Sequence, residues 1–315
     1  MLDVISAVQE LFEKSAATDF SKWLSNLPKG ASWYVISDYV FDDPDRHDTA
    51  SFVVLLSHDR LETILGYIQN QAPVDIKRSK QASEGLVKYL TSPVIFSFTF
   101  VLDEGDNFFS KYASIGNVLD GLEDLLSFSS AIQSGSESKT YFAEVNGRLA
   151  LFAKDMRQKG NAKLARKVLL VASLAAVVMD YLDQNAEPTY IYWVSDRDAI
   201  LQRYDGVVWD VASLYFFYLK FQRIPPFSMI NKPILTHVVP EAKGKNYLDP
   251  MIRLADYLAA AASSLNFYTF EYGHPKLRFV GNECFKKAKN SVLCTMSWTG
   301  EGFHVRRYLG NTGSD

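Results

Sequence analysis

Residues 33–40 read WYVISDYV, residues 49–56 read TASFVVLL, and the segment between them, residues 42–45, reads DDPD. Runs rich in β-branched and aromatic residues favour strands, whereas an Asp/Pro-rich segment favours a turn. The two runs therefore predict a hairpin with a longer loop. A third run, PVIFSFTFVL at residues 93–102, predicts a buried strand, and TYIYWVS at residues 189–195 predicts a fourth.

Helical patterns surround these strands. Apolar spacing and helix-terminating residues predict helices at residues 2–26, 61–71, 79–90, 140–158, 161–183, 207–221 and 249–264. The last of them is expected to begin with Asp249 as its cap and Pro250 at its first position. The remaining predictions are a flexible polar loop at 127–139, extended chain at 227–239 and β character in the tail 273–315. This order predicts an α/β or α+β fold interrupted by a helical block.

Composition narrows the class of protein. The chain has 315 residues, 48% of them hydrophobic and 22% charged, which excludes a disordered or low-complexity protein. Its formal net charge is −3, so any nucleic-acid site must be a local basic patch. The two cysteines, Cys284 and Cys294, exclude a disulfide framework and a zinc site built from cysteines.

No segment predicts export or membrane insertion. The N-terminal residues carry acidic side chains on an amphipathic pattern, which is not typical of a signal peptide. The most apolar run, residues 168–179, is shorter than the about 20 residues that a membrane-spanning helix needs. A cytoplasmic protein without a membrane partner is therefore expected.

Three aspartates occupy positions where a carboxylate is costly. Asp38 lies inside the first predicted strand, Asp196 closes the fourth, and Asp256 lies beside the apolar stripe of the last helix. A carboxylate in or beside buried surface costs several kcal/mol unless it is paired or binds a cation. A site for Mg²⁺ or Mn²⁺ would explain all three. The alternatives are a turn-initiating role for Asp38, a helix cap at Asp196 and an ion pair between Asp256 and Arg253.

The segment VDIKRSK at residues 74–80 adds a fourth candidate. Asp75 would be a further carboxylate ligand, and Lys77 could meet a phosphate or orient a carboxylate. The alternative is a solvated loop whose charged side chains are exposed.

These segments together resemble the DUF3800 family of bacterial proteins, which has an RNase H-like fold. The resemblance rests on ISDY at 36–39, DIKRSK at 75–80, VSD at 194–196 and RLADYLA at 253–259, of which the last is the most specific. It covers roughly residues 31–102 and 188–265. The chain departs from the family pattern at two positions that hold Glu in the family, where it has Tyr39 and Asp75.

The resemblance implies an α/β fold with an RNase H-like mixed β-sheet flanked by helices. Asp38 and Asp196 would lie side by side at the sheet centre, and Asp256 would reach in from the last helix. A helical insertion is expected between strands 3 and 4. The implied divisions are an N-terminal helical segment at 1–30, a core at 31–102 and 188–265, the insertion at 103–187 and a C-terminal extension at 266–315.

The resemblance also implies a function. It favours a metal-dependent nuclease or related phosphodiester-processing enzyme, in which Asp38, Asp196 and Asp256 hold Mg²⁺ or Mn²⁺. Asp75 would be a supporting ligand, and Lys77 would lie near the phosphate. The alternative is a catalytically degenerate module that binds nucleic acid or protein, and a toxin or defence component acting with a neighbouring protein is a weaker third reading.

A basic stretch in the helical block is the predicted nucleic-acid contact. Its members are Lys154, Arg157, Lys163, Arg166 and Lys167, and they could follow the phosphate backbone of DNA or RNA. The alternative is an ordinary solvated helix face. A homo-oligomer or a protein partner stays open.

Overall fold

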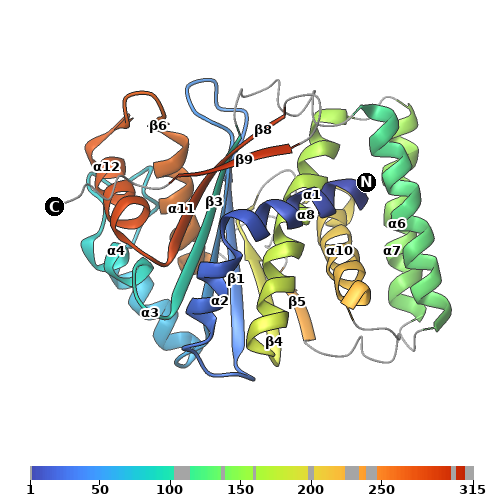
Figure 1. Ribbon diagram of the computed structural model, residues 1–315, viewed down its shortest axis with the longest axis horizontal. Coiled ribbons are helices and arrows are strands. Elements are labelled where there is room, and N and C mark those ends of the chain that lie inside the picture. Colours follow the sequence, from blue (N-terminus) through green and yellow to red (C-terminus); the bar gives the residue numbers. More distant parts are fainter. Residues whose placement is uncertain are drawn as a thin grey trace.

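A seven-stranded mixed β-sheet forms the centre of the protein, which confirms the α/β class (Figure 1). The computed structural model describes residues 2–102, 114–135, 139–158, 161–197, 202–223, 234–238, 247–298 and 303–308. The strands are β1 (Ser32–Val40), β2 (Thr49–Leu56), β3 (Ile95–Leu102), β4 (Tyr190–Ser195), β5 (Ile234–Val238), β8 (Ser291–Trp298) and β9 (Phe303–Tyr308). A separate two-stranded sheet consists of β6 (Leu265–Asn266) and β7 (Glu271–Tyr272).

The sheet order is β5-β4-β1-β2-β3-β8-β9. Strand β2 is antiparallel to β1 and β3, as the predicted hairpin requires, whereas β1, β4 and β5 are mutually parallel. In the β1–β4 pairing, Ser37 lies opposite Ser195. Because parallel strands end at the same edge of a sheet, the residues that follow Ser37 and Ser195 lie close together.

Helices cover both faces of the sheet (Figure 1). One face carries α1 (Leu2–Ser15), α2 (Ala17–Leu24), α8 (Ala162–Ala186) and α10 (Val207–Arg223), and α6 (Ile115–Gly135) and α7 (Lys139–Gln158) lie outside them. The other face carries α3 (Leu61–Gln71), α4 (Glu84–Leu90), α11 (Asp249–Ser263) and α12 (Pro275–Gly281), which continues into a π-helical turn (Asn282–Lys287). A short 3₁₀ turn (Arg203–Asp205) precedes α10.

The alternation of side chains along β1 creates two hydrophobic cores. Trp33 and Val35 are buried against the face covered by α8, whereas Tyr34 and Ile36 are buried against the face covered by α11. Successive side chains of a strand point to opposite faces. Asp38 therefore shares its face with Tyr34, Ile36 and α11.

Most predicted elements are confirmed, including the hairpin, α3 and the helical insertion between β3 and β4. The predicted helix at 2–26 is interrupted at Ala16, and the one at 79–90 begins only at Glu84, with the Ser83 hydroxyl accepting a hydrogen bond from the Leu86 amide. Asp249 is not the cap of α11, because Leu248 holds that position.

The polar interruption predicted at 127–139 is wrong for residues 127–135, which are helical. Helix α6 continues through Gly135, and residues 136–138 lie outside the described part of the chain. Ser129 and Ile132 are fully buried within α6. Tertiary burial of this helix face outweighs the low helix propensity of its serines.

The segment expected as a C-terminal extension, 266–315, continues the sheet. Strand β8 pairs in parallel with β3, and β9 pairs antiparallel with β8. Of the segment predicted to be extended at 227–239, residues 234–238 form β5, and the others lie outside the described residues. None of the described helices combines the length and the apolar character that a membrane span needs.

Candidate carboxylate site

Asp38 and Asp196 lie together at the edge where β1 and β4 end. Asp38 belongs to β1 and is 5% exposed, and Asp196 directly follows β4, where its amide donates to the Ser37 carbonyl at 3.3 Å. Burial raises the pKa of Asp38 well above its usual range, and the nearby carboxylates of Asp256 and Asp196 raise it further. The pairing of two parallel strands therefore brings two carboxyl groups together, one of them in buried surface.

Asp256 reaches the same place from α11, which packs across β1 and β2. Its side chain is 7% exposed, and its Oδ2 accepts a hydrogen bond from the Ile76 amide at 3.2 Å. Burial raises the pKa of Asp256 to about 6, while the ammonium group of Lys77 and the Ile76 hydrogen bond oppose the rise. The charges of Asp75 and Asp196 add to the rise.

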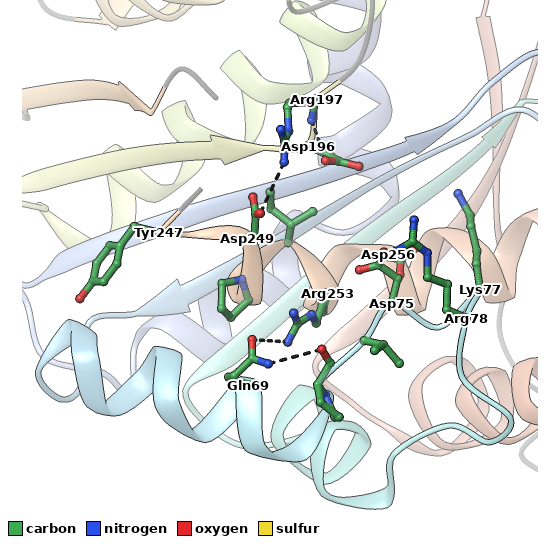
Figure 2. Close-up of a pocket in the computed structure, with 14 residues that line it drawn as sticks. Gln69, Asp75, Lys77, Arg78, Asp196, Arg197, Tyr247, Asp249, Arg253 and Asp256 are labelled. Atoms are coloured by element: carbon green, nitrogen blue, oxygen red, sulfur yellow. Dashed lines mark hydrogen bonds and ion pairs between the residues drawn. The ribbon is translucent and has the colours of Figure 1, made fainter. Parts of the chain in front are cut away.

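The loop at residues 75–79 carries Asp75 and Lys77 to the site. The amides of Arg78 and Ser79 donate to the Asp75 carbonyl at 3.0 and 3.1 Å, which closes a tight turn. Asp75, Lys77 and Arg78 are exposed, as the solvated-loop alternative expects, yet all three line a cavity beside Asp256 (Figure 2).

Lys276, in α12, binds the backbone of this loop. Its Nζ donates to the carbonyls of Ile76 at 2.6 Å and Ser79 at 2.8 Å, and approaches the Lys77 carbonyl at 3.5 Å. Hydrogen bonds from a charged donor are stronger than neutral ones. The C-terminal part of the chain thus holds the backbone that donates to Asp256. No pattern in the sequence indicates this contact.

The cavity has a volume of about 480 Å³. Asp75, Lys77, Asp196 and Asp256 line it, whereas Asp38 is not among the lining residues. The other charged lining residues are Arg78, Arg197, Asp249 and Arg253. The sequence had indicated Asp249 only as a helix cap and Arg253 only as a partner of Asp256, and it gave no functional signal for Arg78 or Arg197. Figure 2 shows Asp75, Asp256, Lys77 and Arg78 on one side and Asp196 with Arg197 at the end of β4.

Each of the three aspartates also had a purely structural alternative: a turn-initiating role for Asp38, a helix cap at Asp196, and an ion pair with Arg253 for Asp256. Asp38 lies within β1 and precedes the 42–45 turn. Asp196 Oδ1 accepts from the Arg197 amide at 2.7 Å, and the residues that a helix cap would serve begin in the segment outside the described residues. Arg253 donates to Gln69 Oε1 at 2.9 Å and to the Ala72 carbonyl, and Asp256 receives its hydrogen bond from Ile76 instead.

The donor chemistry of this cluster fits a divalent cation. Mg²⁺ and Mn²⁺ prefer carboxylate oxygens, and burial, the largest cause of the raised pKa values of Asp38 and Asp256, makes the charged form of both groups costly when no cation is bound. Within the described ranges, however, no three His, Cys, Asp or Glu side chains converge closely enough to hold a metal ion as they stand. Bound metal would have to draw the carboxylates together.

Tyr39, where the family pattern has Glu, lies on the opposite face of the sheet from Asp38. Its ring stacks on Phe41 at a centroid separation of 5.7 Å, and its hydroxyl lies 2.7 Å from Ser37 Oγ. Tyr39 belongs to the core that includes Trp33 and Val35. A carboxylate at position 39 would therefore lie on the face of the sheet away from Asp38.

The predicted basic stretch lies on the other side of the sheet, on α7 and α8 (Figure 1). Lys167 is 4% exposed and pairs with Asp42, and Lys163 pairs with the same carboxylate at 2.7 Å. Arg157 pairs with Glu123, Arg166 is half-buried, and Lys154 is exposed. The five residues do not form one free cationic face, and the structure does not bring them to the carboxylates.

Comparison with known proteins adds no relative: no family model, no curated protein and no solved structure matches the chain.

Proposed function

We propose that the protein is a divalent-metal-dependent nuclease, or a related phosphodiester-processing enzyme, with an RNase H-like fold and a resemblance to the DUF3800 family. The observation that carries the proposal is the gathering of Asp38, Asp196 and Asp256 from β1, β4 and α11 at one edge of the sheet. This is the placement that the resemblance implies: acidic residues from the first and fourth strands lie side by side, and the last helix supplies a third.

The three aspartates would hold Mg²⁺ or Mn²⁺, with Asp75 as a supporting ligand. The bound ion would supply activation of water and stabilisation of the leaving oxygen in the hydrolysis of a phosphodiester to a phosphate monoester and an alcohol. Lys77 places a positive charge beside the cluster, where it opposes the raised pKa of Asp256 and would face the phosphate of the substrate.

The burial of Asp38 and Asp256 supports an energetic argument for a functional site. Carboxylates with raised pKa values lower the stability of the folded protein at neutral pH. Residues that carry such a cost are typical of functional sites. A cation in the cluster would remove the cost by favouring the charged form of each carboxylate.

The test is cleavage of labelled single- and double-stranded DNA and RNA with Mg²⁺, with Mn²⁺ and with EDTA. Cleavage is expected only with metal, and Asp38→Asn should abolish it. Asp59→Asn is the matched control, because Asp59 is an exposed aspartate before α3 whose Oδ1 accepts a hydrogen bond from the Arg60 amide. Unchanged cleavage by Asp38→Asn would contradict the proposal.

A second candidate is a catalytically degenerate module that binds nucleic acid or protein. The absence of a converged metal-binding group within the described residues favours it. This candidate expects binding of nucleic acid or a protein partner without cleavage under either metal. It also expects Asp38→Asn and Asp59→Asn to bind as the wild type does.

A further inference from the structure

A second, smaller cavity is lined in part by the loop that carries Lys77. Its volume is about 180 Å³, and Lys77 lines both this cavity and the carboxylate cavity. The polar side chains in its lining are all basic, whereas the larger cavity mixes acids and bases. They are Arg46, Lys77, His274 and Lys276, and Ile76, Ala260 and Leu277 complete the wall.

Four separate parts of the fold supply this lining. Arg46 comes from the loop between β1 and β2, Lys77 from the 75–79 loop, Ala260 from α11, and His274 and Lys276 from the start of α12. The loop of Arg46 is tied to the end of α11, because the His47 amide donates to the Ser263 carbonyl at 2.9 Å. Separate parts of the fold thus bring the basic residues to one cavity.

The donors in this cavity are not equivalent. Lys276 already donates to the carbonyls of Ile76 and Ser79, so it contributes positive charge more than a new hydrogen bond. His274 Nδ1 accepts from the Lys276 amide at 3.2 Å, which leaves its other ring nitrogen for a ligand. Arg46 Nε lies 3.4 Å from Asp43 and retains further N–H groups, since guanidinium carries five.

We propose that this basic cavity is a phosphate subsite next to the carboxylate site. An anion is the ligand that a lining of Arg, Lys and His recognises, and Arg in particular suits the geometry of phosphate oxygens. A volume of about 180 Å³ is below the about 300–1,000 Å³ of pockets that enclose whole small molecules, so it suits a single phosphate group better than a nucleoside.

The position of Lys77 between the two cavities specifies the substrate class. This step rests on the proposed function: one phosphate lies at the carboxylates, and a second phosphate of the same strand occupies the basic cavity. The substrate is therefore a polynucleotide strand with at least two phosphates, and a mononucleotide engages only one of the two subsites.

The test is binding of a fluorescein-labelled 12-nucleotide single strand, as DNA and as RNA, followed by anisotropy in EDTA so that cleavage cannot occur. Arg46→Gln should weaken binding about tenfold, and Arg46→Lys should restore most of it. The slope of the logarithm of the association constant against the logarithm of the salt concentration should decrease in magnitude by about 0.7, the value for one phosphate contact on a single strand. Lys88→Gln is the matched control, because it removes the same charge from an exposed site on α4.

The outcomes separate this proposal from the nuclease proposal. The subsite is supported if Arg46→Gln changes affinity and salt slope, whether or not the wild type cleaves with metal. It is overturned if Arg46→Gln behaves as Lys88→Gln does, or if the wild type binds no strand. Equal thermal unfolding midpoints of the three variants ensure that the comparison reports on binding.

Discussion

Replacing Asp256 by Asn should make the metal-free protein more stable. Asp256 is 7% exposed, and its burial raises the pKa of the carboxyl from 3.8 to about 6. Asn has nearly the same shape, carries no charge, and its side-chain oxygen can still accept from the Ile76 amide. The substitution therefore removes the cost of the buried charge and keeps the hydrogen bond.

The sign follows from proton binding. The folded state binds the proton of Asp256 more tightly than the unfolded state, so the charge costs nothing well below pH 3.8 and costs most above pH 6. At about 1.4 kcal/mol per tenfold change in acid dissociation constant, the rise in pKa corresponds to about 3 kcal/mol at pH 8. At pH 4 the same relation leaves less than about 1 kcal/mol.

Urea unfolding in EDTA at pH 8 and pH 4 measures both values, with Asp59→Asn as the matched control at an exposed position. We expect Asp256→Asn to raise the free energy of unfolding at pH 8 by up to about 3 kcal/mol and to have little effect at pH 4. A loss of stability at pH 8, or an equal gain at both pH values, would refute the reasoning, since neither outcome is consistent with an unbalanced buried carboxylate.

Three further predictions follow from the same geometry. Adding Mg²⁺ should raise the thermal unfolding midpoint of the wild type more than that of Asp38→Asn, and equal shifts would exclude metal binding at Asp38. Lys276→Met should speed amide hydrogen exchange in the 75–79 loop at least tenfold, because two charge-assisted hydrogen bonds are worth about 1.5–3 kcal/mol each, whereas Lys286→Met should leave it unchanged. Tyr39→Phe should lower the free energy of unfolding by about 1 kcal/mol and leave cleavage within twofold, and abolished cleavage would place Tyr39 in the site.

Local patterns were sufficient for most elements of the fold. The two strand-rich runs flanking the DDPD turn became β1 and β2 in antiparallel pairing, and the periodic segment 61–71 became α3. These elements are set by residue type and spacing over a few residues, which a sequence contains directly. Where local propensity and burial disagreed, as in the serine-rich end of α6, the buried contacts of Ile132 outweighed propensity.

The sequence indicated the candidate site only through aspartates that occur where the surrounding pattern predicts buried strand or helix. Asp38 could be singled out because Asp is a poor strand former, and the resemblance to a known family suggested that it would meet Asp196 and Asp256. The basic stretch was selected by charge alone, and charge along a helix does not reveal which partners it will meet. Lys167 forms an ion pair with Asp42, which lies 125 residues earlier in the chain.

The sequence by itself determined where most of the strands and helices lie, and which aspartates occupy positions where a carboxylate is costly. Only the tertiary structure decided that β8 joins the sheet beside β3, that Lys276 holds the loop of Asp75 and Lys77, and that a basic cavity adjoins the carboxylates. The physical reason is the distance along the chain over which each interaction acts. Propensity and periodicity act between near neighbours in the chain, whereas each of these contacts joins segments about 200 residues apart and depends on how the sheet orders its strands.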